Sequence, residues 1–423
     1  GIGRERQSEI YIAGIGGMGT APLAILLRGM GCRVSGYDDN LRDYVQTQLE
    51  RAGVIIERDI PAECGLVCAS SALAEDHPIL AHARERGCRL LRRGELLAEV
   101  ARGKRLAAVC GSHGKTSTTA LLIDALESAG ADFSYALGGF YKDASRPPAR
   151  WSEDAEWLVV ELDESDGTIE SFAPELTVLV NFDWDHPAQY ARPEDLQDAF
   201  GRLFARTNGS ILIPVECDPL ETAAQETGAS VHRYQSLHDQ DDNPAQVSLA
   251  GPLAGRFELA LEGAFNRHNA AAALSAAYLM GFSPQRDALK GSHGVRRRQD
   301  MLADWPGLRV VADYAHHPNE VAALLRYLRD QQSGRLLVVF QPHRYSRTQL
   351  FADAFAEALT PADKVLLMPV YAAGEQPVSG GSSERILEAF GGDLASGGRA
   401  ELCARPADVQ AALESLIAET PGQ

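Results

Sequence analysis

A buried strand, a loop with two glycines and a helix follow one another near residue 110, and this pattern limits the fold most. The loop Gly111-Ser-His-Gly-Lys-Thr116 lies between the apolar run Leu106–Cys110 and the helical stretch Ser117–Ser128. Glycines let backbone N–H groups face a phosphate, and a helix N-terminus adds its positive end. Lys115 is placed to bridge β- and γ-phosphates, and the Thr116 hydroxyl is placed to bind Mg²⁺. We therefore expect an ATP-binding α/β domain.

The loop is a short form of the phosphate-binding motif. The strict motif has a glycine five residues before Gly114, where this chain has Val109. The alternative is an ordinary strand-to-helix turn with a surface lysine, but the strand and helix around the loop favour nucleotide binding. The predicted ATP-binding residues of this loop are Gly111, Ser112, His113, Gly114, Lys115, Thr116 and Ser117.

Two polar clusters follow neighbouring predicted strands of the same domain. Glu161 comes directly after the strand Trp157–Val160, and Asp185-His186 follows the strand Thr177–Val180. Carboxyl ends of parallel strands are where ligands bind in such sheets. We predict that Glu161 and His186 join Thr116 at the metal, and that Lys115 and these groups carry the phosphoryl transfer. The alternative is an acidic, solvated loop.

A second glycine motif lies near the N-terminus. Gly14, Gly16 and Gly19 fit G-x-G-x-x-G after the strand Glu9–Ala13, and Asp38 stands about 20 residues on, where an acid that binds ribose is expected. Taken alone, the motif predicts a nicotinamide dinucleotide site and an oxidoreductase. A nucleotide-linked substrate at this loop and ATP at the other accounts for both motifs.

Composition narrows the functional class. The 423 residues suggest about two to four domains, and the net charge of −18 argues against nucleic-acid binding. No apolar run has the roughly 20 residues that span a bilayer. Seven scattered cysteines indicate reduced thiols in a cytoplasm. Of these, Cys64 and Cys68 are the only close pair, and a zinc site there is disfavoured because no second pair stands at ligand spacing.

The last third of the chain carries two further polar clusters. Asp313-Tyr-Ala-His-His-Pro318 follows a predicted strand, Arg309–Ala312, and Gln341-Pro-His-Arg-Tyr-Ser-Arg347 follows the strand Leu336–Phe340. Arginine guanidinium groups suit bidentate binding of carboxylate or phosphate. We therefore expect Arg344 and Arg347 to clamp an anionic group.

In combination, these motifs resemble the Mur ligases of bacterial cell-wall synthesis, in order over nearly the whole chain. The matching strings are Gly14-Ile-Gly-Gly-Met-Gly19, Val34-Ser-Gly-Tyr-Asp38, Ser70-Ser-Ala-Leu73, Gly111-Ser-His-Gly-Lys-Thr-Ser-Thr-Thr119, Asp163-Glu-Ser-Asp166, Asp185-His186, Arg267-His-Asn269, Arg297-Arg298, Asp313-Tyr-Ala-His-His-Pro318, Gln341-Pro-His-Arg-Tyr-Ser-Arg-Thr348 and Val370-Tyr-Ala-Ala-Gly-Glu375.

The resemblance implies an α/β protein of three domains. These are a Rossmann-like domain that binds a UDP-sugar over residues 1–103, a central phosphate-loop ATPase domain over 104–296, and a Rossmann-like ligase domain over 297–423. Family members carry a further glycine-rich strand segment after the position of Gln423. We therefore expect the third domain to be truncated at its end.

The resemblance also implies the reaction and its substrates. ATP phosphorylates the lactyl carboxylate of UDP-N-acetylmuramate, and the amine of L-alanine then attacks the acyl phosphate. The implied residues are, for the UDP-sugar, Gly14, Gly16, Gly17, Gly19, Asp38, Ser70 and Ser71; for ATP, additionally His268, Asn269, Arg298 and Asp313; and for L-alanine and the acyl phosphate, Tyr314, His316, Arg344 and Arg347. Among these, His316, Arg344 and Arg347 are expected to be catalytic. Substrates apart, we expect no nucleic-acid or membrane partner and a monomer or homodimer.

Two departures bear on the branch of the family. Ligases that add later residues use a modified lysine after the Asp-His segment, and no lysine lies between Asp185 and Arg206, which fits the branch that adds L-alanine. Ala272 stands where the family often has a second asparagine after Asn269.

Two alternative functions remain open. One is a recycling ligase that attaches a ready-made peptide to the same sugar, and the other is a binding or regulatory protein with a degenerate ATPase.

Overall fold

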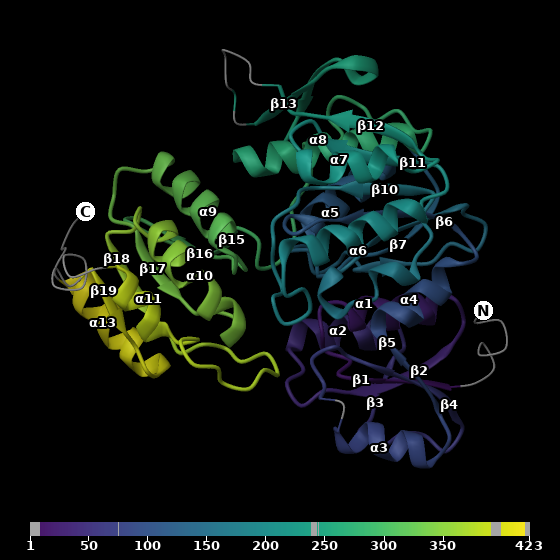
Figure 1. Ribbon diagram of the computed structural model, residues 1–423, viewed down its shortest axis with the longest axis horizontal. Coiled ribbons are helices and arrows are strands. Elements are labelled where there is room, and N and C mark those ends of the chain that lie inside the picture. The colour runs from purple at the N-terminus through teal and green to yellow at the C-terminus, as the bar shows by residue number, and fades with distance from the viewer. Residues whose placement is uncertain (1–8, 75, 238–242, 244, 391–398, 419–423) are drawn as a thin grey trace. The chain divides into compact units, whose positions relative to one another are not determined.

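The computed structural model describes residues 9–74, 76–237, 243, 245–390 and 399–418 (Figure 1). The polypeptide divides into two compact units. One unit holds Gly1–Trp184 and Arg192–Arg296, and the other holds Asp185–Ala191 and Arg297–Gln423. No helix among the described residues is both long and apolar enough to cross a membrane.

The N-terminal part of the first unit is a parallel sheet of five strands in the order β3-β2-β1-β4-β5. Its elements are β1 (Glu9–Ala13), α1 (Thr20–Gly29), β2 (Arg33–Tyr37), α2 (Asp43–Arg51), β3 (Ile55–Ile56), β4 (Cys64–Ala69), α3 (Pro78–Glu85), β5 (Arg89–Arg92) and α4 (Arg93–Ala101). The strand order reverses between β1 and β4, and such a switch point opens a crevice at the carboxyl ends of the two strands. Gly14 and Ser70 lie at those two ends.

The second sheet of this unit has seven strands in the order β12-β11-β10-β6-β9-β7-β8, all parallel except the β7–β8 pair. Its elements are β6 (Arg105–Cys110), α5 (Lys115–Ser128), β7 (Phe133–Ala136), β8 (Ala149–Arg150), β9 (Trp157–Glu161), η2 (Glu164–Asp166), η3 (Ile169–Ser171), β10 (Leu176–Leu179), α6 (Pro193–Ala205), β11 (Ser210–Pro214), α7 (Asp218–Gln225), β12 (Ser230–Tyr234) and α8 (Ala264–Leu279). Strand β6 is flanked by β9 and β10, so the carboxyl ends of all three strands meet at the phosphate loop.

Small side chains hold the central helices close to one another. Helix α8 has a run of buried alanines, Ala270–Ala273, that belongs to the same apolar cluster as Leu121 and Leu122 of α5. Beyond the sheet, β13 (Gln246–Leu249) and β14 (Gly255–Glu258) form an antiparallel pair joined by η4 (Gly251–Leu253). Strand β13 lies within the polar, turn-rich segment 235–252, of which residues 238–242 and 244 lie outside the described part.

The second unit contains a parallel sheet in the order β17-β18-β19 and a separate antiparallel pair, β15-β16. Its elements are β15 (Asp300–Trp305), β16 (Leu308–Ala312), α9 (Pro318–Asp330), β17 (Leu337–Phe340), α10 (Tyr345–Ala358), β18 (Lys364–Leu367), α11 (Ser383–Ala389), β19 (Ala400–Leu402) and α13 (Pro406–Ala418). Phe355, Leu367 and Ile386 are fully buried in its core. The prediction of an α/β fold with parallel sheets is confirmed.

Candidate functional site

The phosphate loop has the backbone that its glycines predict. Gly111 has φ 133° and Gly114 has φ 75°, in the region that favours glycine. A Cβ on Gly111 would lie 2.8 Å from the Asn181 carbonyl oxygen, and one on Gly114 would lie 2.7 Å from Asn269 Oδ1. Helix α5 begins at Lys115, so its first N–H groups face the loop. Val109, at the place of the missing glycine, is fully buried within β6, so the turn here starts only at Gly111.

Lys115 is held inside the loop by several acceptors. Its Nζ donates to the carbonyl of Gly111 at 2.7 Å and to both carboxylate oxygens of Glu164 at 3.0 and 3.2 Å. Burial lowers the pKa of the Lys115 ammonium, but the carboxylates of Glu164 and Asp163 outweigh it and raise the pKa above its usual value. The lysine is therefore charged at neutral pH. No motif in the sequence predicts the pairing of Lys115 with Glu164.

Glu161 is the last residue of β9, and its side chain has the surroundings of a metal ligand. Its Oε2 is buried and has no hydrogen-bond partner within the described ranges. Burial raises the pKa of the Glu161 carboxyl, while a hydrogen bond from Thr116 and the charge of Lys115 lower it. A buried carboxylate oxygen without a donor, beside a threonine hydroxyl, fits a divalent cation with oxygen ligands. The sequence-predicted pair Thr116 and Glu161 is thus brought together.

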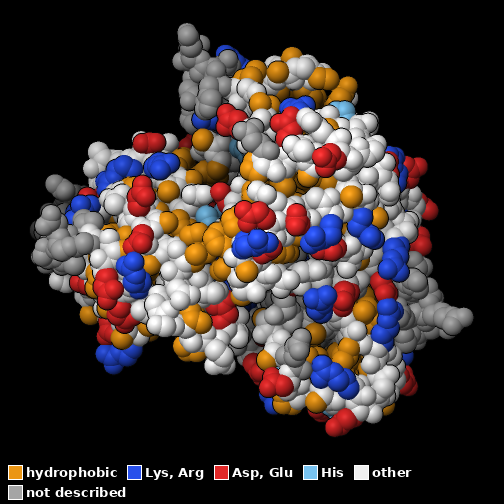
Figure 2. Space-filling view, viewed as in Figure 1, with side chains coloured by type: hydrophobic (Ala, Val, Ile, Leu, Met, Phe, Trp, Pro, Cys, Tyr) orange, Lys and Arg blue, Asp and Glu red, His pale blue; other side chains and the backbone are white. Residues whose placement is uncertain are grey.

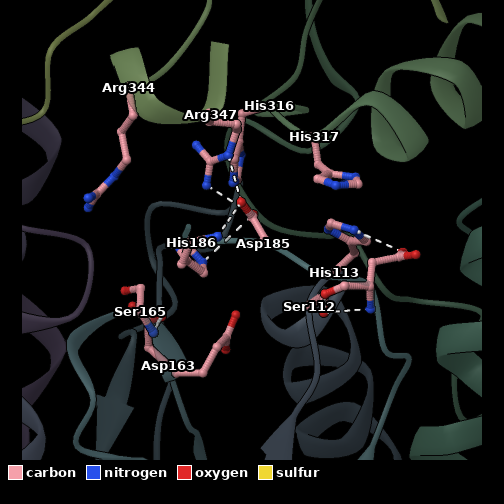
Figure 3. A network of polar contacts seen from close by, with 12 residues as sticks. Ser112, His113, Asp163, Ser165, Asp185, His186, His316, His317, Arg344 and Arg347 are labelled. Atoms are coloured by element: carbon pink, nitrogen blue, oxygen red, sulfur yellow. Dashed lines mark hydrogen bonds and ion pairs between the residues drawn. The ribbon is translucent and has the colours of Figure 1, made fainter. Parts of the chain in front are cut away.

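The loop that follows β10 holds the phosphate loop in place through hydrogen bonds with Asn181 and Asp183. The Asn181 side chain accepts from the backbone N–H of His113 at 2.8 Å and donates to its carbonyl at 3.0 Å. The Ser112 hydroxyl donates to the Asp183 carbonyl at 2.6 Å, and His113 Nε2 lies 3.1 Å from Asp183 Oδ2 (Figure 3). Asn181 and Asp183 therefore shape the loop, a role that their spacing in the sequence did not reveal.

The glycine motif of the N-terminal sheet also has a close-packed backbone. Gly14 has φ 76°, and a Cβ there would lie 2.7 Å from Ser70 Cβ. The N–H of Gly16 donates to Asp38 Oδ2 at 3.1 Å, so the acid expected to bind ribose holds the glycine loop in this structure. The predicted residues Gly17, Gly19 and Ser71 lie in the same two turns, between β1 and α1 and after β4.

Arg93, at the start of α4, connects the N-terminal glycine loop to the acidic segment 163–166, and no sequence pattern predicts this contact. A Cβ on Gly19 would lie 2.9 Å from Arg93 Cδ, so the arginine side chain lies directly against the first loop. Its Nη2 lies 3.7 Å from Asp166 and 3.9 Å from Asp163, on the segment that also supplies Glu164. Arg93 was hard to find because no motif surrounds it.

The residues predicted to contact adenine lie at the start of α8. Asn269 is buried against Gly114, and His268 Nε2 lies 2.7 Å from the Val180 carbonyl and 3.1 Å from the Tyr234 hydroxyl. Ala272 is fully buried in the cluster that α8 forms with α5. The departure from asparagine at this position is thus part of the close helix packing.

In the second unit, Asp185 and Arg347 form a buried ion pair with fork geometry. Arg347 Nε and Nη2 lie 2.8 and 2.9 Å from the two Asp185 oxygens, and both side chains are almost fully buried (Figure 3). Burial raises the pKa of the Asp185 carboxyl, but His186 and Arg347 outweigh it and hold that pKa well below its usual range. The pair explains why the segment Asp185–Ala191 belongs to this unit. Arg347, which was predicted to clamp substrate, already binds Asp185 in this pair.

Two further predicted residues of this unit, Tyr314 and His316, lie beside each other and beside His343, which was not predicted as a site residue. The Tyr314 ring lies 4.8 Å from His316 and 6.0 Å from His343, centroid to centroid. Burial lowers the pKa of His316 to about 4 and that of His343 to about 3, so both imidazoles are neutral at pH 7. Neutral imidazoles accept hydrogen bonds as well as donate them.

Three further predicted residues are held by defined contacts. Asp313 accepts from the N–H groups of Gln299 and Ala315 at 2.8 and 2.7 Å. Arg298 lies 3.4 Å from Glu320, and Arg344 lies 3.5 Å from Glu375. His186 belongs to this unit as well, with its Nε2 3.7 Å from Asp185, and its role as a third metal ligand stays a prediction.

The Asp185–Arg347 pair leads to a stability prediction. Arg347→Met keeps the length of the side chain but leaves a buried carboxylate without its partner, so we expect a loss of about 3–5 kcal/mol from the second unit. Arg344→Met, which removes a more exposed pair, serves as the control and is expected to cost about 1 kcal/mol or less. Because the folded-state pKa of Asp185 is depressed, its contribution is present at neutral pH and disappears as the pH falls through that pKa. Thermal unfolding at pH 7 measures the loss, and a series from pH 5 to pH 2 follows its decline below the unfolded-state pKa of about 4. Equal losses in the two variants at pH 7 would contradict the prediction.

Fold and site together define a class: an α/β protein with a phosphate loop in one sheet, a second glycine loop at the switch point of another, and a separate histidine- and arginine-rich unit. The chain belongs to the Mur ligase family. Residues 9–105 match the Mur ligase family, catalytic domain; residues 109–277 match the Mur ligase middle domain; and residues 297–421 match the Mur ligase, glutamate ligase domain.

Individual relatives agree with this assignment. A UDP-N-acetylmuramate–L-alanine ligase of Kineococcus radiotolerans is 38% identical over 400 residues, covering 89% of this chain and 84% of the relative. One of Synechococcus sp. is 37% identical, covering 91% and 88%. The crystal structure of UDP-N-acetylmuramate-alanine ligase MurC from Thermotoga maritima aligns with TM-score 0.75 at 24% identity, covering 94% and 91%. A murein peptide ligase from Psychrobacter arcticus aligns with TM-score 0.74 at 24% identity, covering 96% and 92%.

Proposed function

We propose that this chain joins L-alanine to the lactyl carboxylate of UDP-N-acetylmuramate in an ATP-dependent reaction of peptidoglycan precursor synthesis. The observation that carries the proposal is the presence of two separate glycine loops in one compact unit, one with Lys115 and the other at the β1/β4 switch point. An oxidoreductase that uses a nicotinamide dinucleotide would need only the glycine loop at the β1/β4 switch point. The curated relatives with this activity, at 37–38% identity, support the alanine-adding branch.

The reaction has two balanced steps. A lactyl carboxylate oxygen attacks the γ-phosphorus of ATP, which gives an acyl phosphate and ADP. The amine of L-alanine attacks the acyl carbon, the carbon–oxygen bond to phosphate breaks, and the amine loses a proton. Both steps build negative charge on phosphate oxygens, so positioned cations and N–H donors lower the barriers.

In the first step, the first unit supplies the phosphate site. Lys115 holds the β- and γ-phosphates, and the N–H groups at the start of α5 bind their oxygens. We propose that Thr116 and Glu161 hold Mg²⁺, with His186 as a further ligand. The unpartnered Glu161 Oε2 supports this ligand set. When bound, Mg²⁺ neutralises charge on the β- and γ-phosphates.

The second unit supplies groups suited to the amino acid and the acyl phosphate. The pKa values of His316 and His343, about 4 and about 3, make both imidazoles weak bases, so we propose that they bind the substrates as neutral hydrogen-bonding groups. Arg344, the more exposed of the two predicted arginines, is the better candidate for binding carboxylate, because Arg347 is engaged with Asp185. Tyr314 packs against the histidine rings and positions them.

Partners and location follow from the same chemistry. ATP and UDP-sugars are cytoplasmic, so we propose a cytoplasmic enzyme. No disulfide joins the seven cysteines in the part of the chain that the structure describes, which is consistent with a reducing compartment. Acidic and basic side chains intermix on the face shown in Figure 2, which does not favour a nucleic-acid partner. A monomer or homodimer remains the expected state.

The decisive measurement is phosphate release from ATP. We expect release only when UDP-N-acetylmuramate, L-alanine and Mg²⁺ are present together, and loss of release when EDTA removes the metal. A panel of amino acids and the peptide L-alanyl-γ-D-glutamyl-meso-diaminopimelate tests the branch. Equal release with that peptide in place of L-alanine would assign the recycling ligase, and binding of a nicotinamide dinucleotide without ATP binding would overturn the proposal.

A further inference from the structure

Glu164 lies at the phosphate loop in a place that the proposed reaction does not explain. It is the first residue of η2, directly after the strand-end acids, and its side chain is fully buried. Its carboxylate forms an ion pair with Lys115 at 3.0 Å. The lysine that is expected to hold ATP phosphates is thus already paired with a negative group of this chain.

The hydrogen-bonding capacity of Lys115 makes the pairing consequential. An ammonium group has three donors. In this structure Nζ lies within hydrogen-bond distance of the carbonyls of Gly111 and Ser112, at 2.7 and 3.3 Å, and of both Glu164 oxygens. Its donors are therefore fully used, and a phosphate oxygen that reaches Nζ has to replace one of these acceptors. Of these acceptors, only the Glu164 carboxylate is negatively charged, as a phosphate is, so it is the acceptor that a phosphate is best suited to replace.

Glu164 cannot easily withdraw from the site. Asp163 accepts a hydrogen bond from the N–H of Ser165 at 3.0 Å, which fixes the start of η2. Asp166 lies 3.7 Å from Arg93, which holds its end. A Cβ on Gly94 would lie 1.8 Å from the Thr168 hydroxyl oxygen, so the next turn is packed tightly against α4. With its backbone anchored, Glu164 keeps its charge close to wherever Lys115 binds phosphate.

We propose that Glu164 is a positioning residue that holds Lys115 before ATP binds and is replaced by the β- and γ-phosphates when ATP binds. The inference rests on the proposed binding of ATP by this loop. Two consequences follow from the exchange. The lysine keeps a counter-charge in both states, which avoids an unpaired buried ammonium. Affinity for ATP is reduced by the energy of the pair that has to be broken, and ADP affinity is reduced in the same way.

The test compares three nucleotides on Glu164→Gln by titration calorimetry with Mg²⁺. The substitution keeps the shape of the side chain and removes its charge, so we expect ATP and ADP to bind about tenfold more tightly than to the wild type. AMP has no β-phosphate for Lys115 and should bind with unchanged affinity. A general disturbance of the loop would affect all three nucleotides, so the difference between ADP and AMP isolates the exchange at the lysine.

Two further variants complete the experiment. Glu170→Gln removes an exposed carboxylate that pairs with Arg202 at 2.8 Å, and it should leave all three affinities unchanged. Glu164→Asp draws the carboxylate back by one methylene and should tighten ADP binding by a smaller factor, which keeps the proposal testable where Glu164→Gln folds poorly. Unchanged or weaker ADP binding in the folded Glu164 variants would overturn the inference. Failure of the wild type to bind ATP at all would instead count against the proposed function.

Discussion

Lys115→Ala is expected to reduce phosphate release in the presence of UDP-N-acetylmuramate and L-alanine by about 10³-fold or more. The lysine is the one ammonium group at the phosphate loop in the described structure, and its Nζ is held by the Gly111 carbonyl and by Glu164. Without it, the charge that develops on the transferred phosphoryl group has no cation from α5. UDP-N-acetylmuramate binding should change little, because the glycines expected to bind it belong to the other sheet of the unit.

The Lys115→Ala variant needs a control for stability. Removing the lysine breaks its buried ion pair with Glu164, which costs about 3–5 kcal/mol by itself. In the double variant Lys115→Ala/Glu164→Gln no unpaired charge remains, so the midpoint of thermal unfolding should recover towards that of the wild type while activity stays lost. Loss of UDP-sugar binding in the folded double variant, measured by calorimetry, would contradict separate sites for the two nucleotides.

Much of the first unit could be predicted because its signals are local. Glycines at the turn after β6 and after β1 require positive φ or close packing, and both loops adopt the predicted strand–turn–helix form. Glu161 was placed beside Thr116 because carboxyl ends of neighbouring parallel strands meet at one edge of a sheet. In each case the signal is either a short local motif or the end of a buried strand, and both can be read from the sequence.

The contacts that sequence reasoning missed join residues far apart in the chain. Lys115 pairs with Glu164, which follows another strand of the same sheet. Arg93 follows β5 of the N-terminal sheet and contacts Asp166, which follows β9 of the central sheet. Side-chain direction decides both contacts, and no periodicity encodes it. The Arg347 fork binds Asp185, 162 residues away in the chain, and its role in clamping substrate stays a prediction.

Secondary structure in the second unit shows a related limit. The segment Arg309–Ala312 was predicted as a strand, and β16 confirms it, but β16 pairs antiparallel with β15 and not with the parallel sheet. Helix α10 begins at Tyr345, before the apolar stretch that starts at Phe351, and has non-helical φ and ψ at Phe351. Its first turn, Tyr345–Thr348, is polar and lacks the apolar spacing that indicates a helix.

Gly138→Ala is expected to lower kcat/KM by about 100-fold, although the change adds a single methyl group. The glycine lies between β7 and β8, and a Cβ there would fall 1.6 Å from Oε1 and 2.0 Å from Cδ of Glu161. Non-bonded heavy atoms do not approach so closely, so the Glu161 carboxylate has to move by more than an ångström. The group predicted to hold Mg²⁺ would then no longer lie beside Thr116.

The neighbouring glycine provides a graded control for Gly138→Ala. A Cβ on Gly139 would lie 3.2 Å from Thr116 Cγ2, a contact that a shift of a few tenths of an ångström relieves, so Gly139→Ala should be much milder. Gly103 has open space around it, and its alanine variant should match the wild type. If Gly138→Ala acts through the metal ligand, raising Mg²⁺ should restore part of its activity, and the Mg²⁺ concentration for half-maximal rate should rise at least tenfold. Activity lost without a change in the Mg²⁺ dependence would show that Gly138 serves the fold of the loop and that Glu161 is not the metal ligand.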